Sequence, residues 1–576
     1  MLTRGWSLDL RDVLIAETVN AGVLVRGGGS LTGDGLVVRD VRSRPSDHGG
    51  GRGLQVGYQE EDSGQVEVTR AVFERSPDVG VLATCAGTRL TLSDVLIADG
   101  RGREGDGASG DGLWVQAGAE VAATRVVIER NREFGVAVVS SRSVTLTDVV
   151  VRDTQGTVGP PGHEGEYGYG IEVVEGAVHG DRILIERNRR SGLVANGAGT
   201  EVRLSDVVVR DTMPGESDGD GEGLWVQEGA LVELTRASLE RNHSIGALAL
   251  GPGTTLTMID LTVRNTQPAA DGTHGWGLAV QAGGAVSVER GLVERSRESG
   301  INAWNAGTTL TLTDVVVRDT QGNDADGSEG FGLSVEDEAR AEVERGLFEG
   351  NGAAGINATG TGTSMALTDV VVRDTGRGTV AGLYGRGLSV EHGAAVEGWR
   401  ILLEGNRGAG AAVINAGSSW TASDVVVRDT ESAVEAGHHG YGVVVSEGGR
   451  ANVTRSAIER NVSAGVRVEL AGSTAVLDDV AVRDTRPRES DGDLGRGVDV
   501  YLGARAEVRR GLIAGNRDGG VVVTGEGASL VLTDSTIRDT TAAPADLRFG
   551  WGLTIREGAT GEVARVLVER NRAAGA

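Results

Sequence analysis

The sequence contains no lysine, so all 56 of its basic residues are arginine. Its one cysteine, Cys85, cannot form a disulfide within the chain, and its strand-like surroundings predict that it is buried. Nine prolines are too few for a proline-rich disordered chain. No apolar run approaches the length of a membrane-spanning helix, and the N-terminus lacks the basic and apolar segments of a signal peptide.

Aromatic residues make up only 3% of the chain, whereas glycine contributes 93 residues. Valine-rich segments lie between the glycines, a composition that indicates β structure with many turns. The formal net charge is −26 at pH 7. Because nucleic-acid binding needs a basic face, this charge excludes a nucleic-acid partner.

Two phrases recur along the chain. The first is TDVVVRDT or a close variant, with its first aspartate at Asp94, Asp148, Asp206, Asp260, Asp314, Asp369, Asp424, Asp479 and Asp534. The second is typified by VERGLVERSRESG at residues 288–300, with its arginine at Arg70, Arg125, Arg182, Arg236, Arg290, Arg345, Arg400, Arg455, Arg510 and Arg565. The two phrases align with each other, so the repeat of about 55 residues comprises two coils, one of which carries a longer loop.

Coils of this length with short alternating strands predict an all-β fold, a parallel β-helix. Residues 1–576 are expected to form one continuous solenoid of about 20 coils. The leucine-rich repeat frame is absent, and helical periodicity is nowhere sustained. A glycine opens each coil, as at Gly332 and Gly355. This recurrence predicts a backbone with positive φ or one too crowded for a Cβ atom.

Stacking of the coils predicts columns of paired side chains. Opposite charges are expected to alternate, with Arg290 against Asp314 and Glu294 against Arg318. A polar column alternates asparagine with threonine, as at Asn351 and Thr320. Stacked amides and hydroxyls of this kind are expected to form hydrogen-bonded ladders.

The coil length, corner glycines and asparagine–threonine column resemble the right-handed parallel β-helix proteins of the pectin-lyase-like superfamily. More narrowly, they resemble the repetitive β-helix proteins found among bacterial exported and surface proteins. The resemblance covers nearly the whole chain and implies an extracellular or cell-surface location. It does not imply one activity, since the fold is shared by lyases, hydrolases, epimerases, adhesins and passenger domains.

Both ends of the sequence are expected to lie inside a coil. Residues 8–16 (LDLRDVLIA) match residues 90–98 (LTLSDVLIA), and the last residues lead into a position where another strand would begin. Because solenoids need caps over their terminal coils, the chain is expected to be a section of a longer protein.

The catalytic signatures of enzymes with this fold are missing. The Asn-Thr-Asp and Arg-Ile-Lys runs of the hydrolases, the Arg-x-Pro-x-x-Arg of the lyases and the Asp-Pro-His-Asp of the epimerases do not occur. The adjacent pairs Asp478–Asp479 and His438–His439 are interpreted as turn residues. No catalytic residue is therefore predicted, although a polysaccharide lyase or hydrolase with an unrecognised catalytic coil stays an alternative.

The variable loops are where function is expected to reside. Several are acidic and rich in glycine, and their flexible carboxylates are candidate weak ligands for Ca²⁺. The candidates are Asp218, Asp220, Asp324, Asp326, Asp491 and Asp493. None fits the EF-hand frame, and glycine with aspartate is also common in turns. No other cofactor is predicted.

A large residue often precedes the glycine that opens a coil after a loop. Four aromatic members of this column are candidate carbohydrate-binding residues: Trp276, Phe331, Tyr441 and Trp551. A row of exposed rings stacks well on sugars. The alternative interpretation is that each ring anchors its own loop to the solenoid.

The favoured hypothesis is a non-catalytic extracellular or cell-surface β-helix, an adhesin-like spacer or passenger with variable loops along one edge. The alternatives are a polysaccharide-active enzyme and a polysaccharide-binding module. Expected partners are polysaccharides or cell-surface components, with no nucleic acid and no membrane span in this chain.

Overall fold

The computed structural model describes residues 5–58, 62–159, 165–215, 221–376, 385–433, 439–488, 490–544 and 549–572. It divides into two compact units, Met1–Arg290 and Gly291–Ala576. Within each unit the described residues form parallel strands and no helix, and the strands make up two sheets. The predicted all-β class and right-handed parallel β-helix are confirmed.

In the N-terminal unit, the first sheet comprises β1 (Ser7–Arg11), β2 (Leu14–Ala16), β4 (Gly29–Asp34), β5 (Val37–Arg39), β7 (Gly64–Glu74), β9 (Arg89–Ala98), β11 (Glu120–Glu129), β13 (Ser143–Arg152), β15 (Ala177–Glu186), β17 (Glu201–Arg210), β19 (Leu231–Glu240) and β21 (Thr255–Arg264). Its second sheet comprises β3 (Ala21–Val25), β6 (Arg52–Val56), β8 (Val79–Thr84), β10 (Asp111–Gln116), β12 (Phe134–Val139), β14 (Tyr169–Val174), β16 (Ser191–Asn196), β18 (Glu222–Gln227), β20 (Ile245–Leu250) and β22 (Trp276–Gln281). The unit boundary falls within β23 (Ala285–Glu294).

In the C-terminal unit, the first sheet comprises β25 (Thr309–Arg318), β27 (Arg340–Glu349), β29 (Ser364–Arg373), β31 (Ala395–Glu404), β33 (Ser419–Ser423), β34 (Val426–Arg428), β36 (Arg450–Glu459), β38 (Thr474–Arg483), β40 (Arg505–Arg509), β41 (Leu512–Ala514), β43 (Ser529–Thr533), β44 (Thr536–Arg538), β46 (Thr560–Ala564) and β47 (Leu567–Glu569). Its second sheet comprises β24 (Ser299–Trp304), β26 (Phe331–Glu336), β28 (Ala354–Thr359), β30 (Arg386–Glu391), β32 (Ala409–Ile414), β35 (Tyr441–Ser446), β37 (Ala464–Glu469), β39 (Arg496–Tyr501), β42 (Gly519–Thr524) and β45 (Trp551–Arg556).

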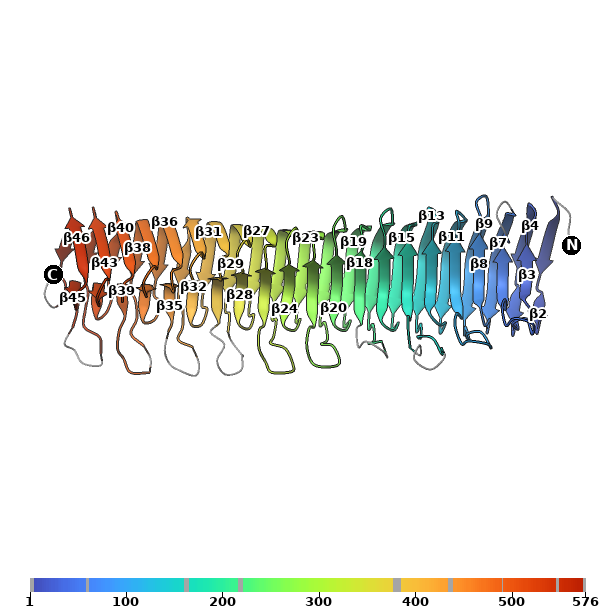
Figure 1. Cartoon of the computed structure of the whole chain (residues 1–576), viewed down its shortest axis with the longest axis horizontal. Helices are drawn as coiled ribbons and strands as arrows, with labels where there is room; N and C mark the ends of the chain where they lie inside the picture. Colours follow the sequence, from blue (N-terminus) through green and yellow to red (C-terminus); the bar gives the residue numbers. More distant parts are fainter. Residues whose placement is uncertain are drawn as a thin grey trace. The chain divides into compact units, whose positions relative to one another are not determined.

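The core consists of columns of alternate strand residues. In the first sheet of the C-terminal unit, Leu312 of β25 lies opposite Val343 of β27, which lies opposite Leu367 of β29, and all three side chains are buried. Alternation of apolar and polar residues along each strand places one set of side chains inside the coil and the other on its outer face. The longer connections that the structure describes leave each unit along one edge (Figure 1).

The glycine that opens a coil is required by crowding. At Gly332 an added Cβ atom would lie 2.5 Å from the carbonyl oxygen of Gly355 and 2.6 Å from Nδ2 of Asn351. The φ angle of Gly332 is not positive. Of the two explanations predicted for this column, close approach of the backbone is therefore the one that applies here.

The buried asparagines bond mainly to backbone, which differs from the predicted ladder of side chains. Oδ1 of Asn351 accepts a hydrogen bond from the backbone N–H of Thr320 at 3.1 Å, and Nδ2 donates to the carbonyl oxygen of Val317 at 3.2 Å. Within the described part of the chain the Thr320 hydroxyl has no hydrogen-bond partner. The amide thus satisfies a backbone donor and acceptor where the coil turns.

The charged columns confirm one predicted pairing and correct the other. Arg318 donates to Glu294 at 2.9 Å, 24 residues away, as predicted. Arg345, however, makes two hydrogen bonds to Asp314, 31 residues earlier, at 2.6 and 2.9 Å, rather than to Asp369. Each such arginine has an aspartate in both neighbouring coils, and its planar fork can close on only one carboxylate. The predicted pairing of these arginines with the following aspartate is wrong.

Among the described residues, no helix has the length and apolar character needed to cross a membrane.

Candidate functional site

The predicted aromatic column lies on the second sheet. In the C-terminal unit, every second strand of this sheet begins with a large residue and the strands between begin with a small one. The large residues are Phe331, Arg386, Tyr441, Arg496 and Trp551, and the small ones are Ala354, Ala409, Ala464 and Gly519. Two strand spacings separate successive large residues by about 9.6 Å. Two of the small residues, Ala354 and Ala409, lie beneath hollows between the large ones.

The first hollow has a volume of about 320 Å³ and lies over Ala354, between Phe331 and Arg386. It is lined by Glu329, Phe331, Glu336, Ala353, Ala354, Asn357, Thr359, Arg386, Ser389 and Glu391. One aromatic ring, several hydrogen-bonding groups and three carboxyl groups therefore face the same cavity. This combination is typical of a binding site for a polar ligand with apolar faces.

Hydrogen bonds fix most of the polar groups of this cavity. The Ser334 hydroxyl donates to Glu336 Oε1 at 2.6 Å and accepts from Asn357 Nδ2 at 3.0 Å. Arg386 donates to the Ser389 hydroxyl at 2.9 Å and forms an ion pair with Glu391. The charge of Arg386 is thus already balanced by a carboxylate of the cavity itself.

Two carboxyl groups of the cavity hold protons unusually strongly. Burial raises the pKa of Glu329 to about 7, and the nearby carboxylates of Glu298, Glu336 and Asp326 contribute further. Burial also raises the pKa of Glu336, although the hydrogen bond from the Ser334 hydroxyl opposes the shift. A partly protonated carboxyl group at neutral pH can both donate and accept hydrogen bonds.

A second hollow of about 200 Å³ lies over Ala409, between Arg386 and Tyr441. The Tyr441 ring meets the His439 ring edge-on at a centroid distance of 5.6 Å, and the Arg467 guanidinium lies 5.8 Å from its centroid. Arg386 lines both hollows. We call the two hollows together the groove; it extends across β26, β28, β30, β32 and β35 to the end of β37.

The other two predicted aromatic residues have different surroundings. Trp276, in the N-terminal unit, is 9% exposed and packs against Ile245, Leu248 and Ala279, with the His274 ring edge-on at 4.8 Å. These contacts are those of a loop anchor. Trp551, in the C-terminal unit, is half-buried and meets the Phe549 ring at 4.7 Å. Sugar stacking at these two residues stays a prediction.

The acidic loops form contacts of their own. Asp324 forms an ion pair with Arg297 at 3.1 Å, and Asp326 accepts a hydrogen bond from the Ser328 backbone N–H at 2.8 Å. Asp491 pairs with Arg488 at 2.7 Å, and Asp493 lies 3.8 Å from the same arginine.

Two further calcium candidates, Asp218 and Asp220, lie outside the described residues. Among the residues that are described, no group of three or more acidic, histidine or cysteine side chains has the geometry of a metal site. Calcium binding by these loops stays a prediction.

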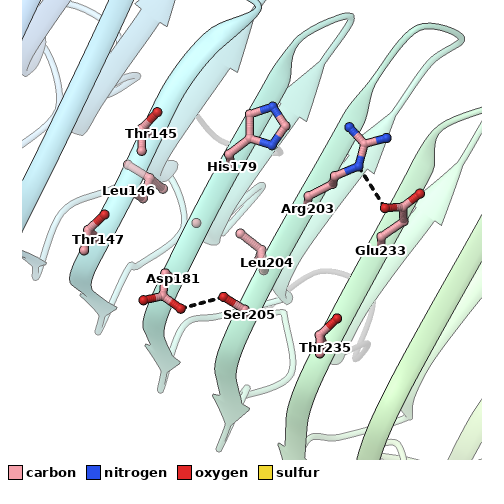
Figure 2. Close-up of a pocket in the computed structure, with 11 residues that line it drawn as sticks. Thr145, Leu146, Thr147, His179, Asp181, Arg203, Leu204, Ser205, Glu233 and Thr235 are labelled. Atoms are coloured by element: carbon pink, nitrogen blue, oxygen red, sulfur yellow. Dashed lines mark hydrogen bonds and ion pairs between the residues drawn. The ribbon is translucent and has the colours of Figure 1, made fainter. Parts of the chain in front are cut away.

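A third cavity, of about 350 Å³, opens on the first sheet of the N-terminal unit (Figure 2). It lies over Gly180, which stands between Leu146 and Leu204. Its charged groups are already paired. Arg203 donates to Glu233 at 2.8 Å, and the Ser205 hydroxyl donates to Asp181 at 2.5 Å. Gly180 has no side chain, which explains the depression. Because its charged groups already have partners, this cavity is a weaker candidate for a binding site than the groove.

One carboxyl group of the N-terminal unit is buried without a partner. Asp111 at the start of β10 is 1% exposed, and neither of its carboxyl oxygens has a hydrogen-bond partner among the described residues. Burial raises the pKa of Asp111 well above its usual range, and the carboxylates of Glu133 and Asp78 raise it further; together they outweigh the opposing effects of the nearby Phe134 backbone N–H and the Arg103 guanidinium. Folding therefore favours the protonated form of this residue.

We expect Asp111→Asn to stabilise the protein at neutral pH by about 1–3 kcal/mol. Below the unfolded-state pKa both states of the wild type bind this proton, so its ionisation costs no stability. As pH rises above that value, the unfolded state releases the proton first, so the wild type loses stability that the variant keeps. Urea unfolding at pH 3.5 and pH 7.5 tests this. Equal effects at both pH values would contradict it, and Asp94→Asn, which removes an exposed ladder carboxylate, should not stabilise at either pH.

One feature of the sequence does indicate the groove. Alternation of large and small residues down one column predicts hollows at regular intervals. The sequence does not indicate Glu329 and Glu336 in the same way, because Glu329 lies in a variable loop and Glu336 at the end of a short strand.

No family model matches the chain, and no curated protein matches it. Solved structures with detectable similarity include Vag8 in complex with C1 inhibitor, at 12% identity, 97% coverage of this chain, 100% of that chain and a TM-score of 0.25. A PL6 family alginate lyase, AlyGC, matches at 10% identity, with 98% of each chain covered and a TM-score of 0.24. Pectate lyase Pel9A matches at 9% identity, with 64% of this chain and 68% of that chain covered and a TM-score of 0.19. The fold that this chain adopts, a right-handed parallel β-helix, rests on the strand pairing within each unit.

Proposed function

We propose that this chain is a non-catalytic extracellular or cell-surface β-helix protein, adhesin-like or a passenger, that binds a polysaccharide in the groove of its C-terminal unit. The observation that carries the proposal is the groove itself. Phe331 and Tyr441 occupy one column, four strands apart, and each borders a hollow that also contacts Arg386. The surface location follows from the family resemblance.

The spacing of the groove suits a chain of sugars. Phe331 and Tyr441 are separated by four strand spacings, or about 19 Å, so an extended oligosaccharide lying across the strands can meet both rings. Aromatic rings supply the apolar contact that sugar faces need, and the hydroxyl and amide groups between them supply hydrogen bonds.

We expect Phe331→Ala and Tyr441→Ala each to weaken polysaccharide binding at least tenfold, because each removes one ring at an end of the groove. The measurement is retention on, and calorimetric titration with, a panel of neutral, acidic and amino-bearing polysaccharides, with and without Ca²⁺. Trp399→Ala is the matched control, since Trp399 is 46% exposed on β31 of the first sheet in the same unit. Unchanged binding in both groove variants would overturn the proposal.

A polysaccharide hydrolase is the second candidate, favoured by the pKa of Glu329 of about 7 inside a cavity. A carboxyl group that keeps its proton near neutral pH is suited to protonating a leaving oxygen. The same panel, analysed for shortened chains, tests it. Cleavage that is lost in Glu329→Gln would replace the non-catalytic proposal with this one.

A further inference from the structure

The groove is lined mainly by acids. Five glutamates line its two hollows, against one arginine and one histidine. The glutamates are Glu329, Glu336, Glu391, Glu447 and Glu469, and the basic residues are Arg386 and His439. Arg386 is committed to Glu391, so it does not offset the other four carboxyl groups.

The carboxyl groups differ in their partners. Glu469 accepts from Arg467 at 2.7 Å, and Glu447 accepts from the Asn415 amide at 2.7 Å. Glu329 and Glu336 form no ion pair with any arginine or histidine that the structure describes. Both face the first hollow, next to the Phe331 ring. Two carboxyl groups without a basic partner therefore lie beside the ring that would stack on a sugar.

The excess of acceptors is local to the first hollow. Glu336 already accepts one hydrogen bond, from the Ser334 hydroxyl, and that hydroxyl in turn accepts from Asn357 Nδ2. A ligand that supplies N–H donors and positive charge complements the remaining carboxyl oxygens of Glu329 and Glu336.

We propose that the groove binds an amino-sugar polymer with free ammonium groups, which lie against Glu329 and Glu336 while a sugar face stacks on Phe331. This inference rests on the proposed function and names its ligand class. A uronate polymer would bring one more carboxylate per sugar into a half-buried acidic groove, where like charges repel more strongly than in water. Glu329 is partly protonated near neutral pH. A bound ammonium group favours its ionised form, whereas a neutral polymer supplies no such charge.

The test compares three hexasaccharides by isothermal titration at pH 6.5 and 150 mM NaCl: a glucosamine hexamer, its fully N-acetylated form and a galacturonate hexamer. We expect the glucosamine hexamer to bind at least tenfold more tightly than the acetylated one, and the galacturonate hexamer to bind least. Tetralysine serves as a cation without sugar rings. Because the whole chain is acidic, binding of tetralysine as tight as that of the glucosamine hexamer would overturn the inference.

Two variants locate the effect. Glu329→Gln/Glu336→Gln should reduce the preference for the glucosamine hexamer to less than threefold, while Glu342→Gln/Glu344→Gln removes two exposed acids of β27 on the first sheet and should preserve it. Equal loss in both double variants would show unspecific charge attraction and overturn the inference. Tighter binding of the acetylated or galacturonate hexamer would overturn it and leave the proposed function standing. Binding of no hexamer would overturn the inference, and the polysaccharide panel described above then decides the proposed function.

Discussion

Replacing Asp499 with asparagine is expected to lower the free energy of unfolding of the C-terminal unit by about 2–4 kcal/mol. The Asp499 side chain is fully buried and accepts hydrogen bonds from Arg467 at 2.5 Å and from Arg496 at 3.0 Å. Both arginine side chains are only 16% exposed. Without the Asp499 carboxylate, Arg467 keeps only Glu469 and Arg496 keeps only Asp518 as a charged partner. The two guanidinium groups are then less well compensated in a poorly hydrated place, which is the source of the loss.

Urea unfolding followed by circular dichroism measures the change. The matched control is Asp534→Asn, which breaks a two-bond pair with Arg565 on the exposed face of the first sheet. Water screens that pair, so the control should unfold at the wild-type urea concentration. A wild-type transition in Asp499→Asn would show that solvent reaches the buried charges and would refute the expectation.

Replacing Asn351 with alanine is expected to cost about 3 kcal/mol, because two backbone groups lose their partners at once. The amide side chain is fully buried and bonds the Thr320 N–H and the Val317 carbonyl oxygen. Alanine leaves both groups facing a dry space that it does not fill. The amide of Thr320 should therefore exchange with deuterium much faster in the variant.

The control for this variant is Asn452→Ala, since Asn452 lies on the exposed face of β36 in the same unit. Its exchange pattern and unfolding midpoint should match those of the wild type. If Thr320 stayed protected in Asn351→Ala, water or a shifted side chain would have to satisfy its N–H, and the backbone role assigned to the asparagine column would be wrong.

Features that recur in every coil were predictable from the sequence. The glycine at 332 and the asparagine at 351 occupy columns, and a column in a parallel stack has one environment, which repetition makes visible. The pairing of Glu294 with Arg318 was predictable for the same reason. The pairing of Arg345 was not predictable. An aspartate lies in the coil on each side of it, and sequence spacing does not show which of the two its guanidinium group binds.

Features that occur once were not predictable. Asp499 and Arg467 stand at a strand position that Val444 and Val522 occupy on neighbouring strands, so nothing in the repeat indicated a buried ion pair there. The groove depends on how Glu329 and Glu336 are buried. Their burial is set by single residues that differ from the repeat. Only its frame of large and small residues was present in the column itself.

The alternating charges of the first sheet restrict how the length of this protein can change during evolution. Arg345 has an aspartate in the coil before it, and Glu294 has an arginine 24 residues after it. Duplication or deletion of two coils keeps every charge beside its opposite. Gain or loss of one coil would place arginine beside arginine and aspartate beside aspartate at the junction. Length variants that survive selection should therefore differ by whole pairs of coils, because only an even number of coils preserves the attraction between opposite charges at the junction.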